Sequence, residues 1–386
     1  MNSLRQRLAA FKKSFWRLVL PPLQKALPLD SRSFGAPRRV SSTPDYCRKR
    51  SLPFHEVYPA KISTYKPPIC INFPESVITS HVFHQALPTG VAVLKNVRVA
   101  SPNGWIIGED DTFLPDHTVS SVYPHTSLIY RKRRFHLNRK LPGRTLLLSS
   151  DHAHINFCHV VADSLPRAHL FEKAGICSYD ELDRIIVPNY SSPGPRKLID
   201  LMGIPTDKLL PITDFEVAEC EELIAPTYPG VDRCIPPWVI HYWQSLVPAP
   251  RKKPWRRLYV PRKKGFRAIS NEEEILPILQ EFGFEILDPG NDSPFEAFQE
   301  AEIIVAPHGA ALIHVVFCQP KTVLIELMSP LYIGIHYYTS SNSAGMDYYS
   351  ILGTVAPGAP GLVHAVDYAI SPDLLRKVLQ DVTSKS

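Results

Sequence analysis

The stretch Ile303-Ile-Val-Ala-Pro-His-Gly-Ala-Ala-Leu312 decides the fold of this chain of 386 residues. Its opening apolar run is typical of a buried strand, and Pro307 marks the end of that strand. Small residues after the His308-Gly309 turn open a helix, whose first main-chain N–H groups are left accessible to an anion. We therefore predict a strand, a turn and a helix that can hold a phosphate. A plain turn capped by His308 is the alternative.

Strands and helices alternate regularly on both sides of this stretch. Strands are predicted at residues 257–261, 284–287, 303–306 and 322–327, and helices at 271–282, 293–301 and 310–317. Because the connecting loops are short, this alternation favours a parallel sheet covered by helices. Ligands of such sheets bind at the carboxyl ends of the strands. The region is therefore predicted to be a Rossmann-like domain with its ligand near His308.

The first half of the chain shows a less regular α/β pattern. Strands are predicted at residues 91–94, 104–107, 146–149, 184–188 and 223–225, and helices at 155–174 and 195–202. The length of the chain favours two domains. We expect an α/β protein with an N-terminal arm and Pro-rich linker over 1–68 and Rossmann-like domains over 69–235 and 236–355. A C-terminal segment over 356–386 should contain a helix, at 373–382, that packs back across the domains.

The N-terminal arm carries the basic character of the chain. The first 50 residues hold 12 Lys and Arg against 2 Asp and Glu, whereas the remaining 336 hold 31 against 35. Apolar residues recur at spacings of three and four from Leu4 to Leu18, which predicts an amphipathic helix over 1–20. A basic face beside an apolar face can lie on an anionic membrane, so we expect residues 1–27 to dock there. Packing against the protein itself, or a solvated basic tail, is the alternative.

Cysteine spacing and hydropathy bear on the cellular compartment in which the protein is expected. The chain has seven cysteines, and no pair has the CxxC spacing, so neither a disulfide framework nor a thiolate zinc site is expected. Free thiols fit a reducing cytoplasm. No stretch of about 20 apolar residues occurs, so we expect no membrane-spanning helix. The protein is expected in the cytoplasm, peripherally bound to the inner face of the cell membrane.

Basic residues follow the strand that ends at Val260. Arg262 and Arg267 lie at the two ends of the loop Arg262-Lys-Lys-Gly-Phe-Arg267, in the same predicted sheet as His308. Two guanidinium groups can hold a diphosphate bidentately and stabilise it as a leaving group without a metal. Gly309 permits a close approach of the phosphate to the backbone. A solvated basic loop is the alternative.

Glu326 is a carboxylate inside the apolar strand Val323-Leu-Ile-Glu-Leu327. A buried carboxylate needs a partner. At the carboxyl end of a strand it can accept hydrogen bonds from ribose hydroxyls. A structural ion pair is the alternative.

Candidate acid–base groups lie in the segment Asn156-Phe-Cys-His-Val-Val-Ala-Asp-Ser-Leu-Pro-Arg167. His159, Asp163 and Arg167 are spaced by four, so a helix would place them on one face. A carboxylate beside a histidine is a suitable general base for a hydroxyl group. Pro166 would kink such a helix, and a structural salt bridge is the alternative.

Two further clusters carry weaker predictions. A metal could be bound by Asp151, His152, His154 and His159, but no other residues complete such a site, so we predict none. A basic cluster that could bind nucleic acid or phosphorylated lipid comprises residues 131–134 with Arg139 and Lys140. A solvated loop is the alternative for this second cluster.

Five sequence blocks, in this order, resemble glycosyltransferase family 61, which includes bacterial members tied to capsular polysaccharide synthesis. The blocks are His159 with Leu165-Pro-Arg167, Tyr259-Val-Pro-Arg262 with Arg267, Asn271-Glu272, His308-Gly-Ala-Ala-Leu312, and Glu326. The sequence departs from the family pattern at Val160, where Trp is usual, and at Ala311, where a second Gly is usual. The first departure bears on stacking of the acceptor, and the second on the approach of a phosphate.

The resemblance implies a GT-B architecture, in which two Rossmann-like domains face a cleft, and an inverting mechanism without an obligatory metal or other cofactor. We therefore expect a glycosyltransferase that moves a sugar from a nucleotide-sugar donor to a glycan or lipid-linked acceptor, in surface polysaccharide synthesis. The acceptor is assigned to residues 69–235 and the donor to 236–355. Predicted donor-binding residues are Arg262, Arg267, His308, Gly309, Ala310, Ala311 and Glu326. On the acceptor side Asp163 is the preferred base and His159 the second choice, and the flanking residues are Asn156 and Arg167.

Two other functions stay open. One is a non-catalytic nucleotide- or sugar-binding protein of the same fold, for which the departures at Val160 and Ala311 argue. The other is a nucleic-acid-binding protein that uses the basic arm and the cluster at 131–140. The acidic balance of residues 51–386 and the regular α/β pattern argue against nucleic acid as a partner.

Overall fold

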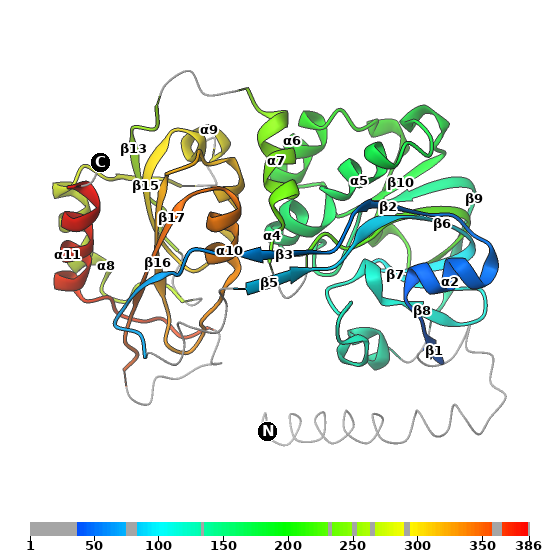
Figure 1. Cartoon of the computed structure of the whole chain (residues 1–386), viewed down its shortest axis with the longest axis horizontal. Coiled ribbons are helices and arrows are strands. Elements are labelled where there is room, and N and C mark those ends of the chain that lie inside the picture. The colour runs from blue at the N-terminus through cyan, green and yellow to red at the C-terminus, as the bar shows by residue number, and fades with distance from the viewer. Residues whose placement is uncertain are drawn as a thin grey trace. The chain divides into compact units, whose positions relative to one another are not determined.

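The computed structural model describes residues 37–74, 83–132, 135–230, 234–248, 253–262, 267–288, 294–356 and 365–384 (Figure 1). Within it the chain divides into two compact units. The first unit comprises the chain up to Pro59 together with Pro88–Tyr228, and the second comprises Ala60–Leu87 together with Pro229–Ser386. The amphipathic helix predicted over residues 1–20 lies outside the described residues.

The second unit is built on a six-stranded sheet in which all neighbouring strands are parallel. Its order is β14 (Glu285–Ile286), β13 (Arg256–Tyr259), β15 (Ala301–Pro307), β16 (Val323–Met328), β17 (Asp347–Leu352) and β4 (Ile69–Ile71). The prediction of a parallel α/β sheet around residues 303–312 is therefore confirmed. The final strand, β4, comes from a distant part of the sequence and was not predicted.

Helices cover both faces of this sheet (Figure 1). On one face α8 (Glu272–Glu281) and α11 (Pro372–Thr383) pack against β13, β15, β16 and β17 through a shared apolar core. On the other face lie α9 (Pro294–Gln299) and α10 (His336–Ser343), together with α7 (Pro237–Leu246) and a 3-10 helix over Ala310–Phe317. Gly283, with a φ of 75°, lets the chain reverse after α8, as a left-handed glycine commonly does.

The first unit holds a nine-stranded mixed sheet with the path β1-β8-β7-β6-β12-β9-β10-β11, and β2 pairs with β6. The bounds are β1 Arg39–Val40, β2 Phe54–Tyr58, β6 Thr89–Ala100, β7 Trp105–Ile107, β8 Thr112–Leu114, β9 Leu137–Leu147, β10 Arg184–Val187, β11 Leu209–Pro211 and β12 Val217–Pro226. Strands β12, β9, β10 and β11 are parallel to one another, as in a Rossmann-like sheet.

Strands β2, β6 and β7 are antiparallel to each of their neighbours, and β8 is antiparallel to β7 but parallel to β1, so this part of the first unit departs from the predicted Rossmann-like arrangement. Only short turns join β6 to β7 and β7 to β8. Short turns enforce hairpins, whereas a parallel pair needs a longer crossover. The α/β class is confirmed, and the first unit is a mixed sheet.

The prediction of an extended linker was wrong for residues 37–68. This segment forms α2 (Thr43–Arg50), β2 and β3 (Lys61–Thr64). The side chain of Ser42 caps α2 by accepting a hydrogen bond from the N–H of Asp45, and Tyr46 and Cys47 enter the core of the first unit. Because the segment is rich in proline and arginine, its composition did not predict a helix that buries only a few side chains.

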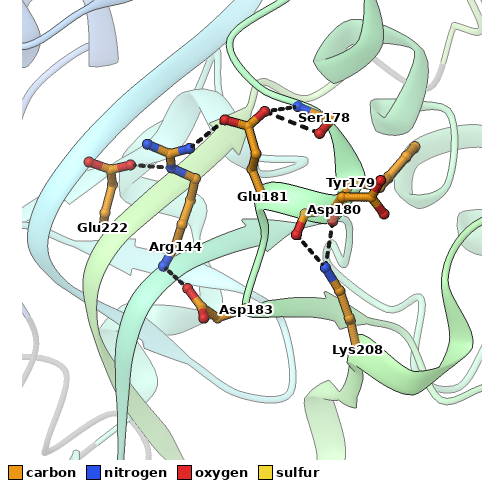
Figure 2. Close-up of polar contacts among 8 residues, drawn as sticks. All are labelled: Arg144, Ser178, Tyr179, Asp180, Glu181, Asp183, Lys208 and Glu222. Carbon is orange, nitrogen blue, oxygen red and sulfur yellow. Dashed lines mark hydrogen bonds and ion pairs between the residues drawn. The ribbon is translucent and has the colours of Figure 1, made fainter.

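Figure 2 shows a network of charged groups that ties two strands of the first unit to the loop before β10. The Arg144 guanidinium on β9 donates to Glu222 on β12 at 2.6 Å and lies 3.8 Å from Glu181. Its main-chain N–H donates to Asp183 at 2.7 Å. Lys208, directly before β11, donates to the carbonyls of Tyr179 and Asp180 and so links the same loop to β11. Because these charges are partly exposed, each pair is worth no more than about 1 kcal/mol, and the network mainly fixes the loop in place.

A buried histidine joins α2 to the sheet of the first unit. His117 is fully buried; its Nδ1–H donates to the carbonyl of Pro226 at 2.9 Å, and its Nε2 accepts from the Thr43 hydroxyl at 3.0 Å. Burial lowers the pKa of His117 to about 3. In the second unit burial likewise lowers the pKa of His314 to about 4.

These two histidines should make the fold sensitive to acid. The unfolded chain takes up protons near pH 6.5, whereas the folded chain resists them until about pH 3 and 4. Their contribution to stability is therefore complete above pH 6.5 and is lost as the pH falls, by about 1.4 kcal/mol per pH unit for each histidine. Thermal unfolding measured from pH 8 to pH 4 should show a melting temperature that falls below pH 6.5. A flat profile, or an unchanged slope in His117→Gln, would contradict this account.

Among the described residues, no helix combines the length and the hydropathy needed to cross a membrane.

Candidate functional site

A local break in the helix after β9 positions the acid–base residues. The helix α4 covers only Phe157–His159, a π-helical turn follows over Val160–Ser164, and α5 begins at Arg167 and ends at Ala174. Pro166 has no N–H and cannot continue the normal helical bonding, and the N–H of Leu165 reaches back five residues to the carbonyl of Val160. Such π-helical turns occur frequently at functional sites.

The π-helical turn keeps His159 and Asp163 together despite Pro166. The distance from Nδ1 of His159 to Oδ2 of Asp163 is 2.6 Å, so the predicted pairing of these two side chains is present. The side chain of His159 is 27% exposed, whereas that of Asp163 is 10% exposed. The imidazole is therefore the more accessible group, and Asp163 binds it from the buried side.

Tyr228, just after β12, completes the pair. Burial, followed by the charge of Asp163 and its hydrogen bond to the phenol, holds the pKa of Tyr228 well above its ordinary value. The hydroxyl therefore remains a hydrogen-bond donor to the carboxylate. With Tyr228 and His159 both bound to it, Asp163 has the environment of a carboxylate that orients an imidazole.

The side chains of Asn156 and Arg167 form hydrogen bonds with main-chain groups of the protein. The side-chain oxygen of Asn156 accepts from the N–H of Cys158 at 3.0 Å and so caps α4. Arg167 is fully buried and donates to the main-chain carbonyls of Asp163, Ser149 and His117 at 3.0, 3.1 and 2.5 Å. Burial lowers its pKa to about 10. Arg167 therefore binds the backbone of Asp163, not its carboxylate. Its buried guanidinium links the segments that contain Asp163, Ser149 and His117.

The neighbouring residues of the possible metal cluster have other roles. Asp151 accepts from the indole N–H of Trp105 at 2.9 Å and from the N–H of Val119 at 3.1 Å. The ring of His152 lies 5.4 Å from that of His159, between centroids. Within the part of the chain that the structure describes, no group of three or more His, Cys, Asp or Glu residues could hold a metal ion.

A second histidine–carboxylate pair lies at the turn after β15. Nδ1 of His308 is 2.5 Å from Oε1 of Glu326, and the hydroxyl of Tyr348 donates to Oε2 at 2.6 Å. The side chain of Glu326 is 0% exposed. Both carboxylate oxygens are thus engaged, and neither reaches the surface. This geometry favours the alternative of a structural pair, in which Glu326 orients His308, over the binding of ribose by Glu326.

Arg262 lies against the turn of His308 and Gly309. Its Nη1 donates to the carbonyl of His308 at 2.8 Å. Gly309 has an extended backbone, so its φ does not require glycine; the reason is space, because a Cβ there would lie 1.9 Å from Nη1 of Arg262. Burial, and next the charge of Arg267, lower the pKa of Arg262.

Arg267 approaches the same place through an aromatic ring. Its guanidinium carbon lies 4.3 Å from the centroid of Tyr332, and the ring of His308 lies 5.2 Å from that centroid. The structure therefore brings Arg262, Arg267 and His308 together at the carboxyl ends of β13 and β15. Two guanidinium groups that repel each other are well suited to share an anion.

The helix after this turn is a 3-10 helix. Ala310 is exposed and Ala311 half-buried, so the start of the helix reaches the surface. His314 is buried beside Phe295 and Phe298, at centroid distances of 5.5 and 5.4 Å, and is a core residue.

An apolar pocket adjoins His308. It has about 400 Å³ of space, part of which is open to solvent, and is lined by Pro68, Cys70, Phe73, Met328, Ile333, Gly334, Ile335, Tyr338, Tyr348 and Ser350. A Cβ on Gly334 would lie 2.6 Å from Cε1 of His308, so the backbone of Gly334 separates the imidazole from the pocket. The cluster of Arg262, Arg267 and His308 thus has an apolar pocket beside it.

Sequence reasoning missed the two tyrosines that bind the carboxylates. Tyr228 follows β12, and Tyr348 lies in β17, so each is far along the chain from one or both members of the pair that it contacts. No spacing in the sequence predicts such a contact. A signal did exist for Glu326. Glu326 on β16 is paired in register with Ala306 on β15, which places it near His308, two residues further along the chain.

A comparison with known families matches a segment that contains the first pair and the histidine of the second. A family model described as Glycosyltransferase 61 matches residues 157–325, a segment that includes His159, Asp163, Arg262 and His308 and ends immediately before Glu326. No curated protein matches the chain. The match extends over less than half of the sequence. Over residues 157–325 the chain is therefore similar to glycosyltransferase family 61, and this similarity supports its assignment to that family as a glycosyltransferase.

Proposed function

We propose that this protein is an inverting glycosyltransferase that transfers a sugar from a nucleotide-sugar donor to a hydroxyl group of a glycan or lipid-linked acceptor. The observation that carries the proposal is the His159–Asp163 pair at 2.6 Å, which lies inside the segment matched by the family. The second unit supplies the complementary chemistry, a cluster of cationic groups around Gly309. We assign the donor to the second unit and the acceptor to the first, in the GT-B manner.

His159 is the proposed base. The carboxylate of Asp163 accepts a hydrogen bond from Nδ1–H of the imidazole, and in the proposed step Nε2 accepts the proton of the acceptor hydroxyl. Asp163 itself is the less exposed group and binds both His159 and Tyr228. The preference for Asp163 as the base that the sequence suggested is therefore replaced by a division of roles, in which Asp163 orients the imidazole and stabilises its protonated form.

The transfer step then balances as a single displacement. The acceptor oxygen loses its proton to Nε2 of His159 and forms a bond to the anomeric carbon. The bond from that carbon to the diphosphate oxygen breaks, and the leaving oxygen keeps the electron pair. Arg262 and Arg267 neutralise the departing diphosphate, and His308 donates to it from Nε2 when its imidazole is protonated. Attack from the face opposite the leaving group inverts the anomeric configuration.

A direct test separates this function from a non-catalytic binding protein of the same fold. Purified full-length protein should gain thermal stability from one or more nucleoside diphosphates, since a ligand of the folded state raises the melting temperature. The matching nucleotide-sugar should then be hydrolysed or consumed by transfer. Binding without any turnover would favour the non-catalytic protein, and stabilisation by nucleic acid alone, with steep salt dependence, would favour the nucleic-acid interpretation.

We also propose that catalysis is independent of divalent metal ions, because Arg262, Arg267 and His308 can supply the positive charge that a metal provides elsewhere. Activity should be unchanged after treatment with EDTA and removal of the chelator. Loss of activity with EDTA, and recovery with manganese or magnesium, would contradict this prediction.

The proposed location is the cytoplasmic face of an anionic membrane, where residues 1–27 would bring the enzyme close to a lipid-linked acceptor. This proposal rests on the sequence of the arm, with its basic and apolar faces. Full-length protein should sediment with vesicles that contain phosphatidylglycerol, and a variant without residues 1–27 should not. Equal sedimentation of the two proteins would exclude the arm as the anchor.

A further inference from the structure

Tyr332 contacts two groups of the proposed diphosphate site and has no role in the transfer step described above. It is the last residue of a tight turn that follows β16 and begins at Ser329, with Pro330 in the second position, where proline is favoured. The N–H of Tyr332 donates to the carbonyl of Ser329 at 3.1 Å, and the Ser329 hydroxyl accepts from the N–H of Leu331 at 3.3 Å. Because Ser329 is 0% exposed, the turn holds Tyr332 on a fixed base.

The ring of Tyr332 packs against the site, whereas its neighbours in the chain do not. Leu331 and Ile333 are 40% and 41% exposed, although both are apolar. The side chain between them is half-buried. Its ring centroid lies 4.3 Å from the guanidinium carbon of Arg267 and 5.2 Å from the ring centroid of His308. One aromatic ring therefore lies close to both a guanidinium and an imidazole.

Two like charges at one site must be held there while no anion is bound. Arg262 is anchored by the carbonyl of His308 at 2.8 Å. The charge of Arg267, after burial, lowers the pKa of Arg262, as expected when two guanidinium groups repel each other. Arg267 also has a φ of 62°, a left-handed backbone conformation that residues with a Cβ seldom adopt. Such a conformation persists only where the surrounding structure holds it.

We propose that Tyr332 is a positioning residue, which holds the Arg267 guanidinium in the diphosphate site by a cation–π contact. This inference rests on the proposed role of Arg262, Arg267 and His308 as that site. The face of an aromatic ring is electrostatically negative and attracts a guanidinium. A carboxylate would attract the guanidinium more strongly, but it would neutralise the charge and compete with a phosphate. An uncharged ring does neither, so Arg267 keeps its positive charge for the ligand.

Two substitutions of Tyr332 separate the aromatic face from the other properties of the side chain. Tyr332→Phe keeps the face and removes only the hydroxyl, so it should bind the anion as the wild type does. Tyr332→Leu keeps an apolar side chain without that face and should weaken binding by about two- to fivefold, the usual contribution of a partly exposed cation–π contact. The probe is inorganic pyrophosphate, and its affinity for the full-length protein is measured by calorimetry. Pyrophosphate carries neither a base nor a sugar, so the donor need not be known.

A double-mutant cycle distinguishes positioning of Arg267 from general damage to the turn. Arg267→Ala alone should weaken pyrophosphate binding by about tenfold, because it removes a charged hydrogen-bond donor. In the Arg267→Ala background Tyr332→Leu should have no further effect, since its target is already absent. The inference would be overturned if Tyr332→Leu bound as tightly as the wild type, if it weakened binding equally in both backgrounds, or if Tyr332→Phe lost as much affinity. Leu331→Ala, at the exposed position of the same turn, is the matched control and should leave the affinity unchanged.

The binding measurement needs no sugar transfer, so failure of this inference and failure of the proposed function can be told apart. Coupling between Tyr332 and Arg267 in a protein that transfers no sugar would overturn the proposed function and leave the positioning role in place. Sugar transfer by a protein in which the two residues contribute independently would overturn the role of Tyr332 alone. A wild-type protein that does not bind pyrophosphate would overturn both the diphosphate site and this inference.

Discussion

Replacement of His159 by glutamine is expected to lower the rate constant of sugar transfer by about 10²- to 10⁴-fold, the usual contribution of a general base. Glutamine can keep a hydrogen bond to Asp163 but cannot take up a proton at neutral pH. The affinity for the nucleoside diphosphate should be unchanged, because His159 lies in the first unit and the cationic cluster in the second. Transfer kinetics with calorimetry on the same preparation would check both parts.

The same variant decides between His159 and Asp163 as the base. His159→Gln retains the Asp163 carboxylate, so substantial transfer by this variant would mean that the carboxylate accepts the proton. If His159 is the base, Asp163→Asn should also be severely impaired, by up to about 10⁴-fold, because an asparagine can stabilise the wrong tautomer of the imidazole. A Tyr228→Phe variant should show a smaller loss, since it removes one hydrogen bond from Asp163 and leaves the imidazole pair intact.

The second large effect is expected at the donor site. Arg262→Ala and His308→Ala should each weaken nucleoside diphosphate binding by about ten- to a hundredfold, because each removes a charge-assisted hydrogen bond worth about 1.5–3 kcal/mol. Gly309→Ala tests the same arrangement without removing a charge. A methyl group there would lie 1.9 Å from Nη1 of Arg262 and would displace the guanidinium.

A matched control exists on the same strand. Arg256 lies at the opposite end of β13 and pairs with Glu285 at 2.5 Å, away from the His308 turn. Arg256→Ala should therefore leave the affinity unchanged. If calorimetry gave the same affinity for Arg262→Ala, His308→Ala and Arg256→Ala, the cluster around Gly309 would not be the diphosphate site.

The contrast between the two units shows what local sequence patterns can predict. In the second unit, helices separate successive strands from β13 to β17, and a parallel arrangement follows from that alternation. The strand β4 was not predicted as part of this sheet because its partner β17 lies far along the chain. In the first unit, hairpins link β6, β7 and β8, and a pattern of short apolar runs does not distinguish hairpins from crossovers.

The site shows the same division between local and distant contacts. His159 and Asp163 are one helical turn apart, so their pairing was predictable from spacing, although the π-helical turn that preserves it was not. Arg167 has the same spacing, yet its buried side chain donates to the main-chain carbonyls of Asp163, Ser149 and His117, of which the last two are far from it in the sequence. The roles of Tyr228 and Tyr348 depend on strand neighbours, which a single sequence does not reveal.

The origin of β4 has a consequence for the order in which the chain can fold during synthesis. Residues 69–71 leave the ribosome before β6, yet their partner β17 is made only near the end of translation. The early strand therefore has no β17 to pair with while the strands of the first unit from β6 to β12 are synthesised. A fragment that starts at Pro229 would lack this strand and expose the edge of β17, so it should aggregate unless residues 60–87 are supplied, in cis or as a separate peptide.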